Sequence, residues 1–532
     1  MTPARAFFLL WALALVAALT LRPLIPPDET RYLQVAHEMW ETGEFLVPHI
    51  QGEPYSHKPP FMFWIWHAGW WFSEPNVFWP RSAQCLAAAL SLCLLWRVAR
   101  RLKPDAQEFA TTAVVLWAGT ATFQLYSSLM LFDVWMSTGV FAAWWGLLMA
   151  LPPDATTRAR PCRGWILFAG GAGSALLFKG PAALVTLLPP LVFMRWWLPS
   201  ERRQRGTWWR ALLAIAAGIG CVLAWALPAA AAGGEEYSNA ILWGQSAGRV
   251  LGDAVPHARP FWWFLALLPA FMAPWTLWPG LWRRHDLAQL GTQTSWRFGL
   301  VTFVAPLVIF SAISGKQPHY LMPALPGCAL MLASCCSGTT APRAWLAGFF
   351  LLGAAVAAAA PWIPVGPLDS SPTAAIIAAC FLAALAGVTW LRRRVAPRIG
   401  ILEAAVYAPL LLASLHVATA PSFAANYNLE PAGRYFKEAE LAGRPAAIYG
   451  ATYHGQVHFL ADIHAPFANP ESEESLREWL RSHPTGVVGI VLQTGRFSPL
   501  EAQAPRIVPY GARRLALFDA PILLARIDAA PR

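Results

Sequence analysis

Long apolar segments, separated by shorter polar ones, run through most of this chain of 532 residues. A segment of about 20 apolar residues is long enough to cross the roughly 30 Å hydrocarbon core of a membrane as one helix. Such segments lie at residues 6–23, 77–96, 109–128, 132–151, 164–180, 181–198, 208–230, 262–282, 297–313, 318–337, 343–363, 373–391 and 401–419. The pattern predicts a mainly α-helical, polytopic membrane protein with about thirteen transmembrane helices, and the run 164–198 can be divided in more than one way.

The first apolar segment, from Phe7 to Leu21, is short and follows Arg5, as a secretory signal peptide would. No small-residue cleavage site precedes Arg22 and Pro23. We therefore expect an uncleaved transmembrane helix here.

The composition agrees with a membrane protein, since 56% of the residues are apolar and only 13% are charged. The net charge of +11 comes largely from basic loops between the apolar segments, so it gives no reason to expect a nucleic acid partner. Seven of the eight cysteines lie in apolar segments and none forms a CxxC pair. Neither a disulfide framework nor a thiolate metal site is predicted.

Basic residues indicate the orientation, because they remain on the cytoplasmic side of short loops. They cluster after the second, fourth, sixth, eighth and twelfth predicted helices, which places these loops inside. Residues 24–76 instead hold two basic residues against seven acidic ones, and we interpret them as a polar stretch outside the membrane. Within it, Thr30–Thr42 is predicted to form an amphipathic helix that lies along the membrane.

The chain changes character at about residue 422, where charged residues become frequent and long apolar segments end. We therefore divide it into a transmembrane domain, residues 1–421, and a small soluble α/β domain outside the membrane, residues 422–532. A helix is expected near Glu473–Arg481, and strands are expected at Ala446–Tyr449, Val487–Leu492 and Ile522–Ile527. The histidines His454, His458 and His464 lack a compact ligand spacing and are interpreted as ordinary surface or core residues.

Ionisable residues gather at the predicted outer ends of the helices. Helix counting places six residues at the outer ends: Asp133, Lys179, His257, Lys316, His319 and Tyr320. A charge near lipid is costly and is usually retained for a function. For any one of these residues alone, a side chain that reaches the membrane–water interface explains its position equally well. Their combination on one face indicates a site that residues 24–76 would cover.

Several of these positions lie in motifs that resemble a known family. The motifs are Pro27-Asp28-Glu29-Thr30-Arg31-Tyr32, Gly43 to His49, Tyr55-Ser56-His57-Lys58-Pro59-Pro60, Asp133, Phe178-Lys179-Gly180, Ser314-Gly315-Lys316 and Tyr320-Leu321-Met322-Pro323. They are similar to those of the polyprenyl-phosphate-sugar-dependent transferases of the glycosyltransferase-C (GT-C) fold, family 39/83, and above all to the bacterial lipid A aminoarabinose transferases. The resemblance covers roughly residues 1–340.

The resemblance implies a glycosyltransferase of the bacterial inner membrane with its active site facing the periplasm. It would move a sugar, a pentose or a hexose and by analogy an amino sugar, from undecaprenyl phosphate to lipid A or to another envelope glycan or protein. We expect inversion by direct displacement, because the outer face shows no nucleophile paired with an acid.

The candidate catalytic residues are Asp28, Glu29 and Asp133. Candidates for binding the donor phosphate are Arg31, Lys58, Lys179, Lys316 and Tyr320. If the acceptor is a hydroxyl, Asp28 would be its general base. If the acceptor is an ionised phosphate of lipid A, Asp28 would orient it or hold a cation.

Relatives of this kind hold a divalent metal with a glutamate just before the lysine of the Lys-Pro motif and with a loop histidine. Here the corresponding residues are His57 and His257. The change removes a negative charge, although zinc accepts imidazole nitrogen readily. A zinc or magnesium site at His57 and His257 is the expectation from the resemblance, and a different donor or acceptor is the other explanation of His57.

A transporter or flippase of lipid-linked sugars is the alternative function. Such proteins show internal repeats and a binding site near the middle of the membrane. This sequence shows no repeat, and its ionisable residues lie at one face. The pattern therefore favours the transferase. Membrane lipids are expected to be among its partners.

Overall fold

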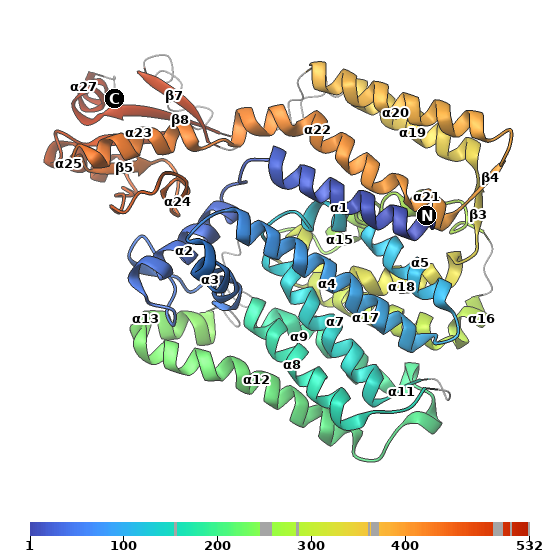
Figure 1. The fold of residues 1–532 in the computed structure, drawn as a ribbon. Helices are drawn as coiled ribbons and strands as arrows, with labels where there is room; N and C mark the ends of the chain where they lie inside the picture. The colour runs from blue at the N-terminus through green and yellow to red at the C-terminus, as the bar shows by residue number, and fades with distance from the viewer. Residues whose placement is uncertain are drawn as a thin grey trace. The chain divides into compact units, whose positions relative to one another are not determined.

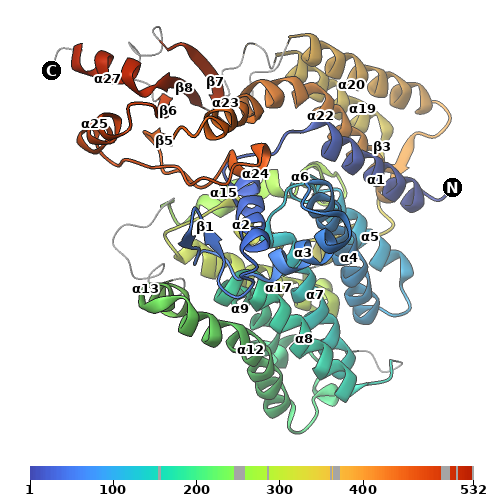
Figure 2. The same cartoon turned by 60° about the vertical axis from the view of Figure 1, so that its left-hand side comes forward.

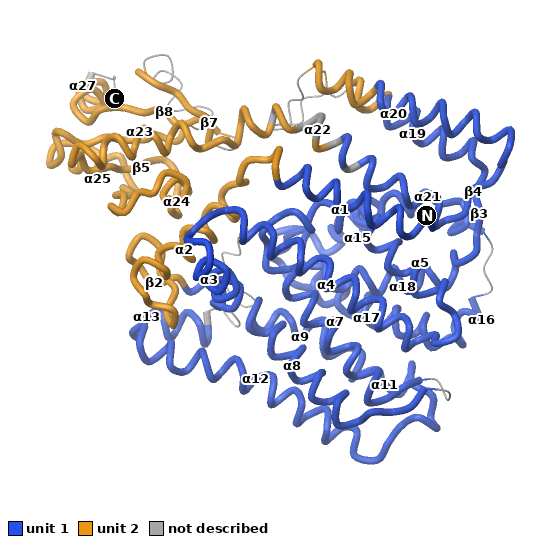
Figure 3. Tube along the Cα trace, in the orientation of Figure 1, with its two compact units in different colours: residues 1–19, 56–354, 380–414 blue, residues 20–55, 355–379, 415–532 orange. Residues whose placement is uncertain are grey.

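The structure is a computed structural model that describes residues 1–153, 157–244, 258–283, 287–359, 362, 372–492, 504–510 and 513–529. The described chain is mainly helical, as predicted (Figure 1). It forms two compact units, coloured separately in Figure 3. The first unit comprises residues 1–19, 56–354 and 380–414, and the second comprises residues 20–55, 355–379 and 415–532.

The first unit is built almost entirely from helices. Its longer helices are α3 (Phe61–Ser73), α4 (Phe78–Leu102), α5 (Gln107–Ala118), α7 (Phe132–Ala150), α8 (Pro161–Lys179), α12 (Thr207–Ala232), α17 (Thr294–Ala312), α18 (Leu325–Cys336) and α19 (Arg343–Ala359). Shorter helices are α6 (Ala121–Tyr126), α9 (Leu184–Leu187), α10 (Pro189–Val192), α11 (Met194–Trp197), α13 (Gly234–Asn239), α15 (Trp263–Phe271), α16 (Leu287–Thr292) and α21 (Ile401–Ala405). Single turns are η1 (Gly180–Ala183), η2 (Ser200–Arg202), η3 (Ala240–Gly244), η4 (Trp275–Leu277) and η5 (Pro318–Leu321), and β3 (Thr340–Pro342) pairs with β4 (Arg398–Gly400).

Four of the described helices belong to both units, namely α1 (Pro3–Leu21), α19, α20 (Pro372–Arg392) and α22 (Tyr407–Tyr427). Within the described residues, six segments are long and apolar enough to cross a membrane: Pro3–Leu21, Phe78–Leu102, Pro161–Val192, Thr207–Ala232, Thr294–Ala312 and Pro372–Arg392. These segments support a polytopic membrane protein, and the count of thirteen transmembrane helices stays a prediction.

Two predicted segments are shorter or more broken than the apolar pattern suggested. The run 181–198 forms η1, α9, α10 and α11 because Pro181, Pro189 and Pro190 interrupt the helical hydrogen bonds. The run 109–128 divides into α5 and α6 at Thr120, whose hydroxyl accepts a hydrogen bond from the Phe123 amide and so caps α6.

The polar stretch predicted at residues 24–76 contains an apolar helix that was not predicted. Residues Phe61–Ser73 form the apolar helix α3, in which Met62, Phe63, Trp66 and Trp70 are buried. No charged residue lies between Lys58 and Glu74, and α3 falls in this interval. With 13 residues, α3 is about 20 Å long, which is too short to cross a bilayer on its own.

Helices α7 and α8 pack unusually closely through glycines. A Cβ atom at Gly171 of α8 would lie 2.5 Å from the Ala143 amide nitrogen, and one at Gly146 of α7 would lie 2.5 Å from the Phe168 amide nitrogen. Small residues allow helix backbones in membranes to approach in this way. Because the helices run antiparallel, this contact brings the beginning of α7 next to the end of α8.

The second unit contains α2 (Asp28–Thr42), which confirms the predicted helix near Thr30–Thr42. A hairpin follows, formed by β1 (His49–Ile50) and β2 (Glu53–Pro54). The Glu38 carboxylate on α2 accepts hydrogen bonds from the amides of Gln51 (2.9 Å) and Gly52 (2.7 Å) in the turn. The hairpin is thereby attached to α2.

The C-terminal part of this unit is a four-stranded sheet in the order β5-β6-β8-β7 (Figures 1 and 2). Its strands are β5 (Ala446–Tyr449), β6 (Val487–Leu492), β7 (Arg506–Tyr510) and β8 (Arg513–Asp519), of which β5 and β6 are parallel and the other pairs antiparallel. Its helices are α23 (Glu430–Leu441), α24 (His458–Ala461), α25 (Glu473–Ser482) and α27 (Ala520–Ala529). Leu515 and Leu517 of β8 pack with α23, whereas Ala516 and Phe518 pack with α25 and α27, so both faces of the sheet are covered.

The predictions for this region are partly confirmed. Strands β5 and β6 and helix α25 lie where they were expected. The strand expected at Ile522–Ile527 was wrong, because these residues belong to α27. Pro521 lies in the first turn of α27, where its missing amide hydrogen and fixed φ are compatible with a helix start. Strands β7 and β8 were not predicted.

Candidate functional site

A buried ion pair forms where α7 begins and α8 ends, in the first unit. Asp133, the second residue of α7, is 2% exposed, and the Lys179 ammonium at the end of α8 donates a hydrogen bond to its carboxylate. The other carboxylate oxygen lies 3.9 Å from His319 Nε2 of η5. A carboxylate at a helix start and an ammonium at a helix end are each favoured by the helix dipole. The fold therefore holds this pair in place.

Aromatic rings and a second lysine complete the group. The Lys179 ammonium lies 4.9 Å from the centre of the Tyr320 ring. Lys58 is the first residue of the Lys-Pro-Pro motif. Its ammonium lies 5.8 Å from the centre of the Phe132 ring, and its charge acts on Asp133. We call Lys58, Asp133, Lys179, His319 and Tyr320 the polar cluster. Four of its members were predicted as site residues, and the structure brings them together with His319.

Lys316, also predicted to bind phosphate, has a different environment. It is 3% exposed, and its ammonium donates hydrogen bonds to the backbone carbonyls of Arg259 (2.9 Å) and Ile313. A backbone bridge between Ala258 and Gly315 joins the same two segments. The positive charge of Lys316 thus stabilises a crossing of two loops.

A second group of polar residues lies at the beginning of α2, in the second unit. The Arg31 guanidinium donates a hydrogen bond to the Asp28 carboxylate, whose side chain is 37% exposed, and lies 5.3 Å from the centre of the Tyr32 ring. Tyr55 contributes to the electrostatic surroundings of Arg31. Tyr32 is buried, and burial raises the pKa of its phenol, which keeps it neutral.

His454, from the C-terminal part of the same unit, lies within electrostatic reach of Asp28 and Arg31. Burial lowers the pKa of its imidazole, and the positive charge of Arg31 lowers it further. The sequence indicated no role for His454, because the two segments are more than four hundred positions apart. No local spacing carries a signal for such a contact.

Glu29, a predicted catalytic residue, is 1% exposed and has structural partners. Its carboxylate accepts hydrogen bonds from Arg22 Nη2 (3.0 Å) and from the Ile25 amide (2.8 Å). These contacts fix the segment that leads into α2. They account for the burial of Glu29 without a substrate.

Of the two predicted metal ligands, only His57 lies within the described residues. His57 is exposed, and His257 lies outside the described residues. Among the described residues, the one group of three side chains able to hold a metal ion consists of His37, Glu41 and Asp462, and it does not include His57. The site at His57 and His257 stays a prediction.

Curated relatives match about 60% of this chain. A protein of Pseudomonas aeruginosa named undecaprenyl phosphate-alpha-4-amino-4-deoxy-L-arabinose arabinosyl transferase is 33% identical over 340 residues, which are 60% of this chain and 58% of that protein. A protein of the same name from Edwardsiella ictaluri is 28% identical over 328 residues, which are 61% of this chain and 57% of that protein. The resemblance predicted from the sequence is confirmed. The chain spans less than two thirds of the length of these relatives, and no family model matches it.

Solved structures show the fold. The apo structure of ArnT from Cupriavidus metallidurans superimposes with a TM-score of 0.71, covers 99% of both chains and is 18% identical. The structure of ArnT from the same organism bound to undecaprenyl phosphate gives a TM-score of 0.67, covers 96% of this chain and 97% of that chain, and is 20% identical. The chain therefore has the mainly helical fold of these ArnT structures.

Proposed function

We propose that this protein is a membrane glycosyltransferase that transfers a sugar, by analogy aminoarabinose, from undecaprenyl phosphate to lipid A. The observation that carries the proposal is the polar cluster, in which a buried carboxylate and two lysines meet. The names of the curated relatives, and the undecaprenyl phosphate bound to one of the ArnT structures, support the choice of donor.

The chemistry of the donor explains why lysines are needed. A sugar on a polyprenyl phosphate carries its own leaving group, and the phosphate departs as an anion. Positive charge fixed in advance near the departing oxygen stabilises the transition state. In the proposal Lys58 and Lys179 supply this charge, Tyr320 donates a hydrogen bond, and Asp133 orients the Lys179 ammonium.

The residues at the start of α2 have roles toward the acceptor in this proposal. Asp28 removes the proton if the acceptor is a hydroxyl, and orients the acceptor if it is an ionised phosphate. Arg31 holds Asp28 and binds phosphate, whereas Glu29 positions the start of the helix. Displacement is direct and inverts the anomeric carbon.

The proposed membrane location and orientation of the protein come from its sequence. The protein would lie in the bacterial inner membrane with about thirteen transmembrane helices. The site and the soluble α/β domain, residues 422–532, would face the periplasm. Zinc or magnesium held by His57 and His257 would supply a Lewis acid. Transport of lipid-linked sugars is the competing function.

The test is mass spectrometry of lipid A from cells that lack the gene and are complemented with wild-type protein or variants. Deletion should remove one sugar mass from lipid A, and the wild-type gene should restore it. Lys179→Met should leave it absent, and purified Lys179→Met should transfer about 100- to 1,000-fold more slowly. A matched control is Lys103→Met, whose ammonium bonds Gln293 (2.6 Å) instead of the polar cluster.

Two outcomes would contradict the proposal. If no envelope glycan or lipid A species changes on deletion while lipid-linked sugar accumulates on the cytoplasmic side, transport is the better explanation. If Lys179→Met and Lys103→Met slow transfer equally in well-folded protein, the polar cluster is not the site.

A further inference from the structure

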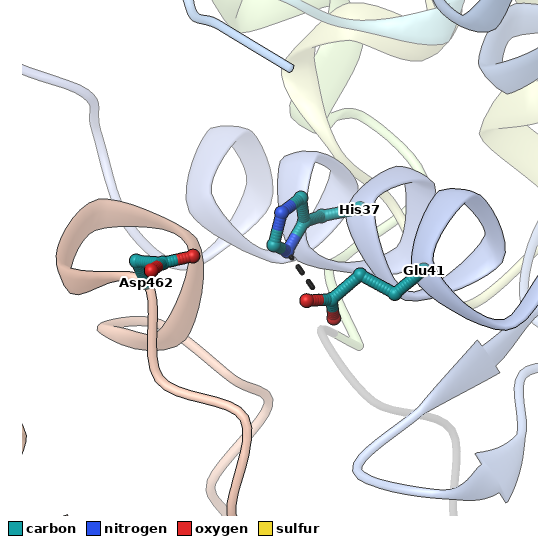
Figure 4. A group of neighbouring side chains, drawn as sticks. All are labelled: His37, Glu41 and Asp462. Atoms are coloured by element: carbon teal, nitrogen blue, oxygen red, sulfur yellow. Dashed lines mark ion pairs between the residues drawn. The ribbon is translucent and has the colours of Figure 1, made fainter. Parts of the chain in front are cut away.

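Three side chains that commonly bind metals meet between α2 and the segment after α24, inside the second unit (Figure 4). His37 and Glu41 are four residues apart on α2, which places them on one face of the helix. Asp462 directly follows α24 and has a positive φ of 52°. One ligand atom from each of the three lies within 4.8 Å of the other two.

The imidazole of His37 is the strongest indication of a ligand. His37 is 8% exposed, and among the described residues its Nδ1 atom has no hydrogen-bond partner. The Glu41 carboxylate lies 3.6 Å away, which is too far for a hydrogen bond. The ring packs edge-on against Phe459 and directs Nδ1 toward Glu41 (Figure 4). A buried ring nitrogen without a hydrogen-bond partner is costly, and a metal ion bound to it would remove this cost.

A fourth donor lies next to the three. His464 Nδ1 lies 2.6 Å from Glu41 Oε1, and His464 Nε2 lies 3.6 Å from Asp462 Oδ1. Lys437 approaches the other side of Asp462, at 3.7 Å from Oδ2. Two carboxylates and two imidazoles therefore share one small volume, with one ammonium at its edge.

We propose that His37, Glu41 and Asp462 bind a zinc ion, with His464 as an additional ligand. Zinc takes imidazole nitrogen and carboxylate oxygen together in four-coordinate sites, whereas calcium and magnesium prefer oxygen ligands alone. The two carboxylates balance the charge of the ion. Metal–ligand distances of about 2.1 Å put neighbouring ligand atoms about 3.4 Å apart in a tetrahedral site. The ligand atoms lie within 4.8 Å of one another in the structure, and the exposed side chains of Glu41 and Asp462 can rotate to bring them closer.

This site would join α2 to the C-terminal part of the chain. The two already touch, since the Gln51 side chain accepts a hydrogen bond from the Phe467 amide (3.0 Å) and Gly455 packs against Gln34. Zinc would add a stronger link at the end of α2 opposite Asp28. Zinc binding here does not depend on the proposed function.

The experiment uses the full-length protein in detergent, freed of metal with a chelator and then titrated with zinc. Zinc content per chain after gel filtration and affinity by competition with a fluorescent zinc indicator are the readouts. We expect His37→Gln and Glu41→Gln each to bind one zinc ion fewer than wild type, with affinity at this site reduced more than about 100-fold. Zinc should raise the thermal midpoint of the wild type more than that of these variants.

Matched variants separate this site from the others. Glu478→Gln removes an exposed carboxylate of the same unit and should keep wild-type zinc binding. His57→Gln tests the other predicted metal site and should not change the ion assigned to His37. If His37→Gln fails to fold, Asp462→Asn replaces a side chain that is 70% exposed and gives the same test. Unchanged zinc content in the Glu41 and Asp462 variants, or no zinc binding by wild type, would show an ion-pair cluster only and overturn the inference.

Discussion

A single methyl group at Gly171 should separate α7 from α8 and disturb the polar cluster. A Cβ atom at this position would lie 2.5 Å from the Ala143 amide nitrogen and 2.6 Å from the Gly139 carbonyl oxygen. Cβ atoms essentially never lie within 3.0 Å of other atoms, and both neighbours are backbone atoms that cannot rotate away. The helices must therefore move apart. Overpacking of this kind costs about 1–3 kcal/mol of stability.

Gly170 provides the matched control, because it is the preceding residue of the same helix. A Cβ atom at Gly170 has no atom within 4 Å. Alanine is about 1 kcal/mol more favourable than glycine inside a helix. Gly170→Ala should therefore be as stable as wild type or slightly more stable, and Gly171→Ala should be less stable although its helix propensity improves equally.

The assay is thermal unfolding in detergent, followed by tryptophan fluorescence, together with the rate of sugar transfer. Gly171→Ala should lower both the unfolding midpoint and the transfer rate, because the contact between the helices sets the distance from Asp133 to Lys179. Equal midpoints and rates for Gly171→Ala and Gly170→Ala would refute this account of how the polar cluster is held.

Three further predictions concern buried ionisable groups. Asp133→Asn leaves the Lys179 ammonium buried without a charged partner and should cost about 3–5 kcal/mol in denaturant unfolding, whereas adding Lys179→Met should recover stability but not transfer. Glu29→Gln should lower the thermal midpoint more than the exposed change Glu478→Gln, because it breaks the buried pair with Arg22. Burial lowers the pKa of His458 from 6.5 to about 4, so on acidification the unfolded state binds a proton before the folded state does. The free energy of unfolding should therefore fall as the pH drops from 6.5 toward 4, by about 3 kcal/mol at most. His458→Gln should flatten this part of a plot of thermal midpoint against pH.

The sequence predicted the membrane class and most of the longer helices, because repeated apolar segments of this length are typical of membrane-spanning helices. Its errors have local causes. Prolines at 181, 189 and 190 divide a run that hydropathy alone treats as continuous. The helix Phe61–Ser73 was missed because it is bounded by charged residues and is too short to span. Residues 522–527 are apolar enough for a strand, and Pro521 before them is the local signal of a helix start.

The polar cluster was partly predictable for a similar reason. Helix counting brings the beginning of one apolar segment and the end of the next to the same level, so Asp133 and Lys179 were expected at one face. Their direct contact depends on the small residues between α7 and α8, which hydropathy does not reveal. The nearness of His454 to Arg31, and of Asp462 to His37, depends on tertiary packing across most of the chain.

Burial alone does not distinguish the ionisable residues that can meet a substrate from those that hold the backbone. Lys316 and Lys179 are both nearly inaccessible, yet the Lys316 ammonium is directed at backbone carbonyls and the Lys179 ammonium at a carboxylate. A carbonyl cannot change its charge or leave, so the first arrangement is a fixed part of the fold. An ion pair can exchange one partner for a phosphate at little cost, since the charge on the lysine is still met. This difference, which only the structure reveals, favours Lys179 and Lys58 over Lys316 as the residues that meet the leaving phosphate, and it makes Lys316 a residue that holds two loops together.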